Sequence, residues 1–115
     1  IAAGTAHVLE TYAEVGASPD RVLSVGGGTK NALWLQATSD FGGVAQHVCE
    51  KTIGASYGDA FLAALAIGAA KPKDILDWNP NASTVTPESV PAYATQYPLW
   101  KRLYAQTKDL MQALP

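Results

Sequence analysis

The chain has 115 residues, fewer than the ~150 typical of one domain, so its length excludes a complete two-domain enzyme. With 48% apolar and 16% charged residues it is too apolar for a disordered chain, and a packed core is expected. Eight basic and ten acidic side chains give a net charge of -2 without a Lys/Arg cluster, which argues against a nucleic-acid partner.

The cysteine and hydropathy patterns restrict the compartment. The one cysteine, Cys49, cannot form an internal disulfide, and a single thiol with two histidines is not a metal-site pattern. The longest apolar run, residues 60–70, is shorter than the ~20 residues of a bilayer span, and no secretion-signal pattern opens the chain. We therefore expect a cytoplasmic protein without a membrane partner or a metal ligand set in these residues.

The first residues have helical periodicity that ends near Gly16. Glycine there favours the left-handed backbone conformation that commonly ends a helix. The apolar stripe of this first helix consists of Val8, Leu9, Tyr12 and Val15. The helix starts at Ile1 without an initiator Met or a capping residue. We therefore expect the sequence to be the C-terminal portion of a longer protein.

A strand, a glycine turn and a second helix follow. Residues 21–25 are rich in apolar and β-branched residues, which predicts a buried strand running into Gly26, Gly27 and Gly28. Apolar residues then recur at helical spacing from position 33 to position 41, with Thr29 or Gly28 as the expected N-cap.

A second strand is expected over residues 44–49, at an edge or half exposed, because Gln46 and His47 interrupt its apolar run. Residues 56–59 match a capping pattern and precede a helix that is apolar on every side, which predicts burial. Residues 71–96 are rich in proline and predict a surface loop. Pro98 suits the first turn of a closing helix over 97–114. This order predicts an α/β fold, a short sheet covered by helices.

The glycine turn is the strongest local signal for chemistry. Glycines before a helix let a ligand approach the backbone, and unpaired N–H groups at the helix start attract phosphate. A tight structural turn without a ligand explains the same glycines equally well. Neither the dinucleotide fingerprint nor the P-loop matches, because Asn31 stands where the first needs glycine and the second needs Ser or Thr.

The segment from Val25 to Asn31, followed by Trp34 and Ser39-Asp40, resembles the adenosine motif of the FGGY family of carbohydrate kinases. These kinases belong to the actin-like ATPase superfamily, whose fold is ribonuclease H-like. Glu50 with Gly54–Ala66, and then Tyr97–Tyr104, resemble the family's next helix and its closing helix. The matches follow the family's order through nearly the whole chain.

The resemblance implies a nucleotide-binding part of an ATP-dependent sugar kinase, the C-terminal portion of its second domain. Such a kinase phosphorylates a hydroxyl of a small sugar or polyol, with Mg²⁺ bridging the phosphates of ATP. By position, Gly27 and Gly28 lie against the phosphates, Gly26 and Thr29 flank them, and Asn31 lies near the adenine. The residues from Gly28 to Asn31 look more like those of ketopentose kinases, so a pentulose substrate is expected.

The resemblance also sets what lies outside these residues. The family's catalytic aspartate is upstream, so no catalytic residue and no Mg²⁺ ligand is assigned here, and the chain alone is expected to be inactive. Its partners are the sugar substrate and the missing N-terminal part of the same protein; a homodimer is an open option. Two other functions stay open: a non-catalytic α/β interaction module, and a different actin-like ATPase such as a chaperone or filament protein.

The remaining polar and aromatic residues have structural interpretations. His7 and His47 are expected at the surface or half buried, and Cys49 as a small core residue. Lys30 can pair with phosphate or face solvent. Six aspartates are expected in caps, turns or helix surfaces: Asp20, Asp40, Asp59, Asp74, Asp77 and Asp109. Four aromatic residues are expected in the core: Trp34, Phe61, Trp100 and Tyr104.

Overall fold

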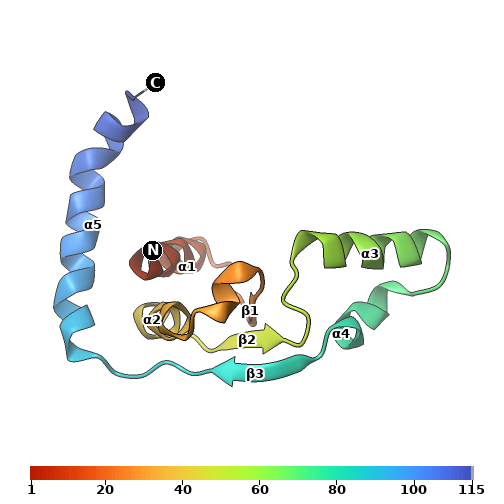
Figure 1. The fold of residues 1–115 in the computed structure, drawn as a ribbon. Coiled ribbons are helices and arrows are strands. Elements are labelled where there is room, and N and C mark those ends of the chain that lie inside the picture. Colours follow the sequence, from red (N-terminus) through yellow and green to blue (C-terminus); the bar gives the residue numbers. More distant parts are fainter. Residues whose placement is uncertain (115) are drawn as a thin grey trace.

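A mixed sheet with helices on one face organises the chain (Figure 1). The computed structural model describes residues 1–114, apart from the side chain of Leu76. The elements in order are α1 (Ala2–Glu14), β1 (Val22–Ser24), the short 3-10 helix η1 (Gly27–Lys30), α2 (Ala32–Gly42), β2 (Gln46–Cys49), α3 (Ala55–Ala66), η2 (Pro72–Asp74), α4 (Ile75–Trp78), β3 (Asn81–Val85) and α5 (Pro91–Gln112).

The three strands lie in the order β1-β2-β3. β1 and β2 are parallel, with Val22 opposite Gln46, and β3 runs antiparallel to β2, with Thr84 opposite His47. The connection between the parallel strands is α2, and α1 packs along α2 on the same side of the sheet (Figure 1). The carboxyl ends of β1 and β2 therefore share one edge, where the glycine turn lies.

The expected α/β fold and its first two strands are confirmed, but β2 is the central strand rather than an edge. The expected burial of the first strand is wrong, because Leu23 is 48% and Val25 52% exposed. The error came from Gln46, which is 4% exposed although it is polar. The prediction of an unbroken surface loop over 71–96 is also wrong, because β3 lies within it. β3 is exposed over most of its length, so it lacks the alternation of apolar residues that marks a strand.

Gln46 joins four elements through its side-chain amide. The Ser24 hydroxyl donates to Gln46 Oε1 (2.7 Å), and Gln46 Nε2 donates to Leu35 O (2.7 Å) and Ser39 Oγ (2.8 Å). Ser39 Oγ in turn donates to Val85 O (3.1 Å) on β3. A buried polar group is stable only when its hydrogen bonds are satisfied, and this network satisfies them while holding both parallel strands against α2.

The first helix is confirmed, but its buried face differs from the expected one. Ala3 and Ala6 are buried, whereas Val8 and Tyr12 of the expected apolar stripe are more than half exposed. Small residues let α1 approach α2 closely, so the alanine face makes the contact. Of the expected apolar stripe, Leu9 is half buried near Gly42 of α2, whereas Val8, Tyr12 and Val15 are exposed.

The apolar helix α3 lies at the opposite end of the molecule from α1 and α2 (Figure 1). Its expected capping box is absent, because Gly54 is the N-cap and makes no side-chain bond. Burial on all sides is also wrong in this chain: Phe61 is buried against the Trp78 ring (5.1 Å between centroids), but Leu62 is 62% and Ile67 81% exposed. The face of α3 that carries Leu62 and Ile67 is therefore not covered by another described helix.

The closing helix α5 is confirmed as a helix but starts earlier than expected. Pro91 rather than Pro98 occupies its first turn, and Pro98 lies inside the helix. In its first turn, the Tyr93 ring stacks on Phe41 of α2 with 3.9 Å between centroids. This contact packs the part of α5 that precedes Pro98 against α2.

An ionic cluster attaches α5 to α1. Tyr97 Oη donates to Glu10 Oε2 (2.9 Å), and Lys101 Nζ donates to Glu10 Oε1 (2.9 Å). The hydrogen bond from Lys101 is the main cause that lowers the pKa of Glu10, with Tyr97 adding to it. Burial, and then the bond to Glu10, raises the pKa of Tyr97 to about 12. His7 is half buried beside Trp100, as expected.

The molecule is extended, with a radius of gyration of 17.2 Å against about 13 Å for a compact chain of this size.

Of the four aromatic residues expected in the core, Phe61 is buried, while Trp34 and Tyr104 are 40% and 43% exposed. Cys49 is buried with a free thiol, as expected. Within residues 1–114, no helix is both long and apolar enough to cross a membrane.

Replacing Gln46 by leucine is expected to lower the free energy of unfolding by about 1–3 kcal/mol, because the Ser24 hydroxyl loses its acceptor in a part-buried place. Urea unfolding measures the loss. The matched change at the exposed Gln106 on α5 should stay within about 0.5 kcal/mol. Equal stabilities of the two variants would contradict the role of the network.

The phenol of Tyr97 is expected to titrate near pH 12 rather than near its ordinary value of 10. Because the folded state holds the protonated phenol, this contribution to stability is complete below pH 10 and is lost as the pH rises through 12. Tyrosinate absorbance, taken as the difference from Tyr97→Phe, measures the midpoint.

Glu10→Gln should move the midpoint of Tyr97 part of the way back toward 10, since burial remains the larger cause. Glu14→Gln is the control on the same helix, and its effect should be smaller because Glu14 acts only through a weaker charge interaction. A midpoint of 10 in the unmodified protein would refute the cluster.

Candidate functional site

The carboxyl edge of the parallel strand pair brings two loops together. β1 leads into the turn at 26–30, and β2 leads into residues 50–54, which precede α3. The Gly26 amide donates a hydrogen bond to Thr52 O, so the two loops are tied to each other. In open α/β sheets, ligands bind outside the carboxyl ends of the strands. This edge is therefore the candidate functional site.

Gly26 gives the turn its shape. Its backbone has φ +86° and ψ -174°, a conformation that residues with a side chain rarely adopt. The next residues wind into η1, in which the amide and the hydroxyl of Thr29 both donate to Gly26 O (3.2 and 2.7 Å). The Thr29 hydroxyl therefore closes the turn.

Asn31 is the N-cap of α2. Its Oδ1 accepts a hydrogen bond from the Trp34 amide (3.0 Å), and its own amide donates to Gly28 O (3.0 Å). The expected cap, Thr29 or Gly28, is wrong because both residues lie within η1 and α2 begins only after Asn31. Capping occupies the oxygen of Asn31, and its Nδ2 group makes no hydrogen bond within the described residues.

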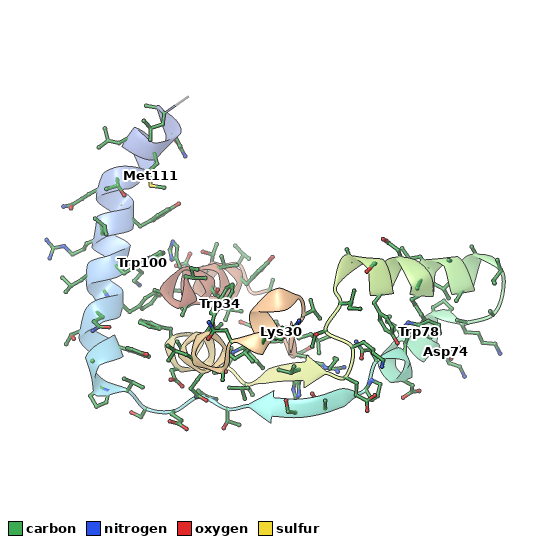
Figure 2. The ribbon with its side chains drawn as sticks, viewed as in Figure 1. Lys30, Trp34, Asp74, Trp78, Trp100 and Met111 are labelled. Carbon is green, nitrogen blue, oxygen red and sulfur yellow. The ribbon has the colours of Figure 1, made fainter. Side chains whose placement is uncertain are left out.

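The amides of Gly27 and Gly28 have no protein acceptor in the part of the chain that the structure describes. Gly27 is exposed, and a Cβ built on it would meet no atom within 4 Å. Lys30 is exposed in the last position of η1 (Figure 2). Two free amides in front of a helix start, with a lysine beside them, can bind an anionic group such as a phosphate.

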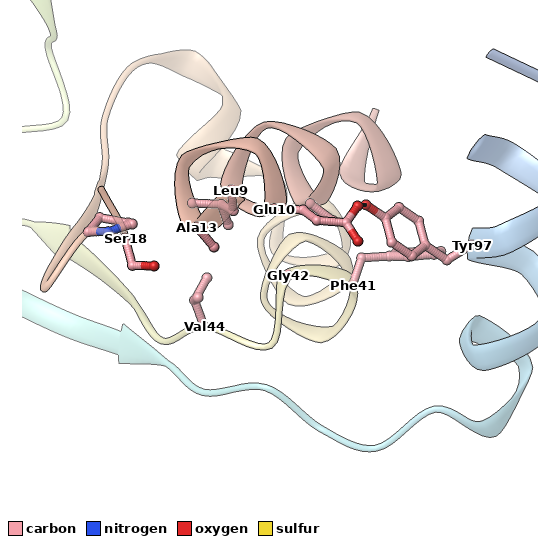
Figure 3. A pocket seen from close by; sticks show the side chains of 10 residues that line it. Leu9, Glu10, Ala13, Ser18, Phe41, Gly42, Val44 and Tyr97 are labelled. Carbon is pink, nitrogen blue, oxygen red and sulfur yellow. Dashed lines mark hydrogen bonds between the residues drawn. The ribbon is translucent and has the colours of Figure 1, made fainter. Parts of the chain in front are cut away.

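A different cavity, of about 340 Å³, lies between α1 and α2 (Figure 3). It includes Ser18 and Val44, which precede β1 and β2, so it lies toward the amino ends of the parallel strands. Its one charged group, Glu10, is already bonded to Tyr97 and Lys101. Unlike the glycine turn, the cavity does not lie at the carboxyl ends of the parallel strands, and its charged group is not free to bind a ligand.

Two of the aspartates accept hydrogen bonds that give them structural roles. Asp40 accepts hydrogen bonds from Gln36 Nε2 and from the Glu88 amide (both 2.7 Å). Asp74 accepts from the Lys71 amide (2.8 Å) at the start of η2. Among residues 1–114, no group of three or more His, Cys, Asp or Glu side chains could hold a metal ion.

Two supports of the turn were missed from the sequence. The carbonyl of Thr52 anchors Gly26, and the buried amide of Gln46 fixes the strands that carry both loops. A backbone carbonyl has no sequence signal. Gln46 did have one, a glutamine inside a short apolar strand, which indicates a buried hydrogen-bond network when the strand is central.

Comparison with known proteins assigns the family. The model of the FGGY family of carbohydrate kinases, C-terminal domain, matches residues 1–67. The chain belongs to the FGGY family of carbohydrate kinases. The match includes the whole glycine turn, both parallel strands and all of α3. The suspected family resemblance is thus confirmed, and the alternative of a different actin-like ATPase is excluded.

Two xylulose kinases resemble this FGGY chain. The xylulose kinase of Bacillus subtilis (strain 168) is 34% identical to this chain over an alignment of 115 positions. The alignment covers 92% of this chain and 22% of that protein. The crystal structure of xylulose kinase from Rhodospirillum rubrum superposes with a TM-score of 0.68 at 23% identity, over 96% of this chain and 23% of that one. The fold is therefore that of an actin-like ATPase, and the chain spans less than a quarter of the length of these relatives.

Gly26→Ala is expected to destabilise the protein by about 1–3 kcal/mol, because alanine is strained at the positive φ of this position. Thermal unfolding followed by circular dichroism measures the change. Gly58→Ala is the control: Gly58 lies inside α3 with open space around it, so alanine should stabilise by up to about 1 kcal/mol. Opposite signs are expected, and a neutral Gly26→Ala would disprove the strain.

Proposed function

We propose that residues 26–31 bind the phosphates and adenosine of ATP in a sugar kinase that phosphorylates a pentulose. The observation that carries this proposal is the pair of unbonded amides of Gly27 and Gly28 at the carboxyl edge of β1 and β2. The pentulose is supported by the similarity to two proteins that are named xylulose kinases. This function deepens the family assignment by naming the nucleotide contacts and the substrate.

Each residue of the turn has a part in the proposed site. Gly26 sets the direction of the turn, and Thr29 closes it through its hydroxyl (2.7 Å to Gly26 O). Gly27 and Gly28 present their amides to the phosphates, and the Nδ2 group of Asn31 faces the adenine. Preorganised amides suit this reaction because phosphoryl transfer depends on positioning and on stabilising charge.

The groups that complete the reaction come from other parts of the protein in this proposal. ATP, when bound, supplies the phosphoryl group that is transferred to the sugar hydroxyl. The catalytic base and the Mg²⁺ ligands are not assigned to residues 1–114, in keeping with the structural roles of Asp40 and Asp74. We therefore expect the isolated chain to show no sugar-dependent ATP turnover.

The exposed apolar faces support a place for this chain within a larger protein, as the C-terminal portion of the kinase's second domain. Leu62 and Ile67 on α3 are exposed. Leucines and a methionine on α5 are exposed as well: Leu99, Leu103, Leu110 and Met111. Covering such faces contributes about 25 cal/mol per Å² of apolar surface, so the rest of a chain of the relatives' length would stabilise α3 and α5.

Gly27→Val in the full-length protein is expected to raise the KM for ATP by at least about tenfold, equivalent to about 1.4 kcal/mol, since a side chain there displaces the phosphates. The KM for the pentulose should stay unchanged. ATP-dependent phosphorylation of xylulose measures both constants, and ribulose and glycerol serve as competing acceptors.

Gly4→Val on α1 is the control, because Gly4 lies on a different element and a Cβ built on it would meet only Cζ2 of Trp100 within 4 Å (3.8 Å). An unchanged KM for ATP in Gly27→Val would remove the nucleotide site from this turn. Faster turnover of glycerol than of either pentulose would overturn the proposed substrate.

A further inference from the structure

The indole ring of Trp34 lies directly against Gly28. A Cβ built on Gly28 would come within 2.9 Å of Cζ3 of Trp34 and within 3.3 Å of Cε3 and Cη2. Contacts shorter than 3.0 Å essentially never occur at real Cβ atoms, so a side chain at Gly28 would have to displace the ring. The turn and the helix behind it are thus in van der Waals contact through this one aromatic residue.

Two independent contacts fix the position of Trp34. Its amide donates to Oδ1 of Asn31, so the residue is held in the first turn of α2. Its ring packs against Gly28 and borders a cavity of about 310 Å³ together with Val25 and Leu35. Trp34 is 40% exposed, and Figure 2 labels it. A ring that is anchored through its backbone to Asn31 and packed against Gly28 can resist movement of the turn.

Gly27 and Gly28 differ in what requires a glycine. Neither has a positive φ, so their backbone conformations are open to other residues. At Gly28 the indole of Trp34 leaves no room for a side chain. At Gly27 a Cβ would meet nothing within 4 Å among the described residues, so the protein itself does not require glycine there.

We propose that Trp34 is the positioning residue of the nucleotide turn, and that Gly28 is needed to fit the indole while Gly27 is needed to fit the nucleotide. This inference rests on the proposed function. The ring holds Gly28 so that the two free amides keep one orientation before a ligand arrives. Preorganisation of this kind increases affinity because less freedom is lost on binding.

The test measures the Kd for ADP by titration calorimetry on the full-length protein, well below its unfolding temperature. Gly28→Ala should weaken binding about tenfold, and Trp34→Leu about threefold, which are typical effects for residues in contact. The double variant Gly28→Ala/Trp34→Leu should bind only as weakly as Trp34→Leu, because leucine leaves room for the new methyl group. Trp34→Phe, which keeps an aromatic ring, should restore most of the affinity.

Gly27→Ala is the matched control for the double variant. Its loss of affinity comes from the ligand side, so combining it with Trp34→Leu should multiply the two single effects. A double variant of Gly28→Ala and Trp34→Leu that also shows multiplied effects would overturn the inference. If Gly28→Ala does not fold, an unchanged Kd in Trp34→Leu overturns it instead.

Different results would contradict the nucleotide site and the positioning role of Trp34. If Gly27→Ala and Gly27→Val leave the Kd for ADP unchanged, the nucleotide site itself is wrong. If they weaken binding but the Trp34 variants do not, only the positioning role is wrong. A residue that merely packed the core would change the thermal midpoint without changing the Kd for ADP, so both quantities are measured on every variant.

Discussion

The site depends on one constraint, the parallel alignment of β1 and β2 held by a buried glutamine. Parallel strands bring their carboxyl ends to the same edge, and only this arrangement places the turn after β1 beside the loop after β2. Gln46 bonds to β1 through Ser24 and to α2 through Leu35 O and Ser39, and Ser39 extends the network to β3. A hydrogen-bonded network in a small core specifies this single register more strictly than apolar packing does.

On that frame, the glycine turn is shaped by three different requirements at three successive residues. Gly26 needs a positive φ, Gly27 leaves open space on the exposed side, and Gly28 admits the ring of Trp34. The turn is tied at both ends, by the bond from Gly26 to Thr52 O and by the cap of Asn31. A run of identical residues therefore contains distinct functions, and substitutions at each should fail for a different reason.

Local signals predicted the elements that carry the site. The β-branched run at 21–25, the glycines and the helical period after them gave the strand, turn and helix with bounds close to those observed. The same signals failed where partners far apart in sequence decide the outcome. Gln46 looked like an edge residue, β3 looked like a loop, and α3 looked buried, because strand order and packing are not local properties.

The sequence by itself determined the family, the α/β class and the glycine turn, since collinear motifs and short-range periodicity are written in neighbouring residues. Only the tertiary structure decided that Asn31 caps α2, that Thr52 anchors Gly26, and that the indole of Trp34 fills the space at Gly28. The physical reason is that residue types and their spacing do not fix which atoms meet, even for residues as close in sequence as Asn31 and Trp34. Hydrogen bonds and van der Waals contacts depend on ångström-scale approach of atoms, and folding alone sets that approach.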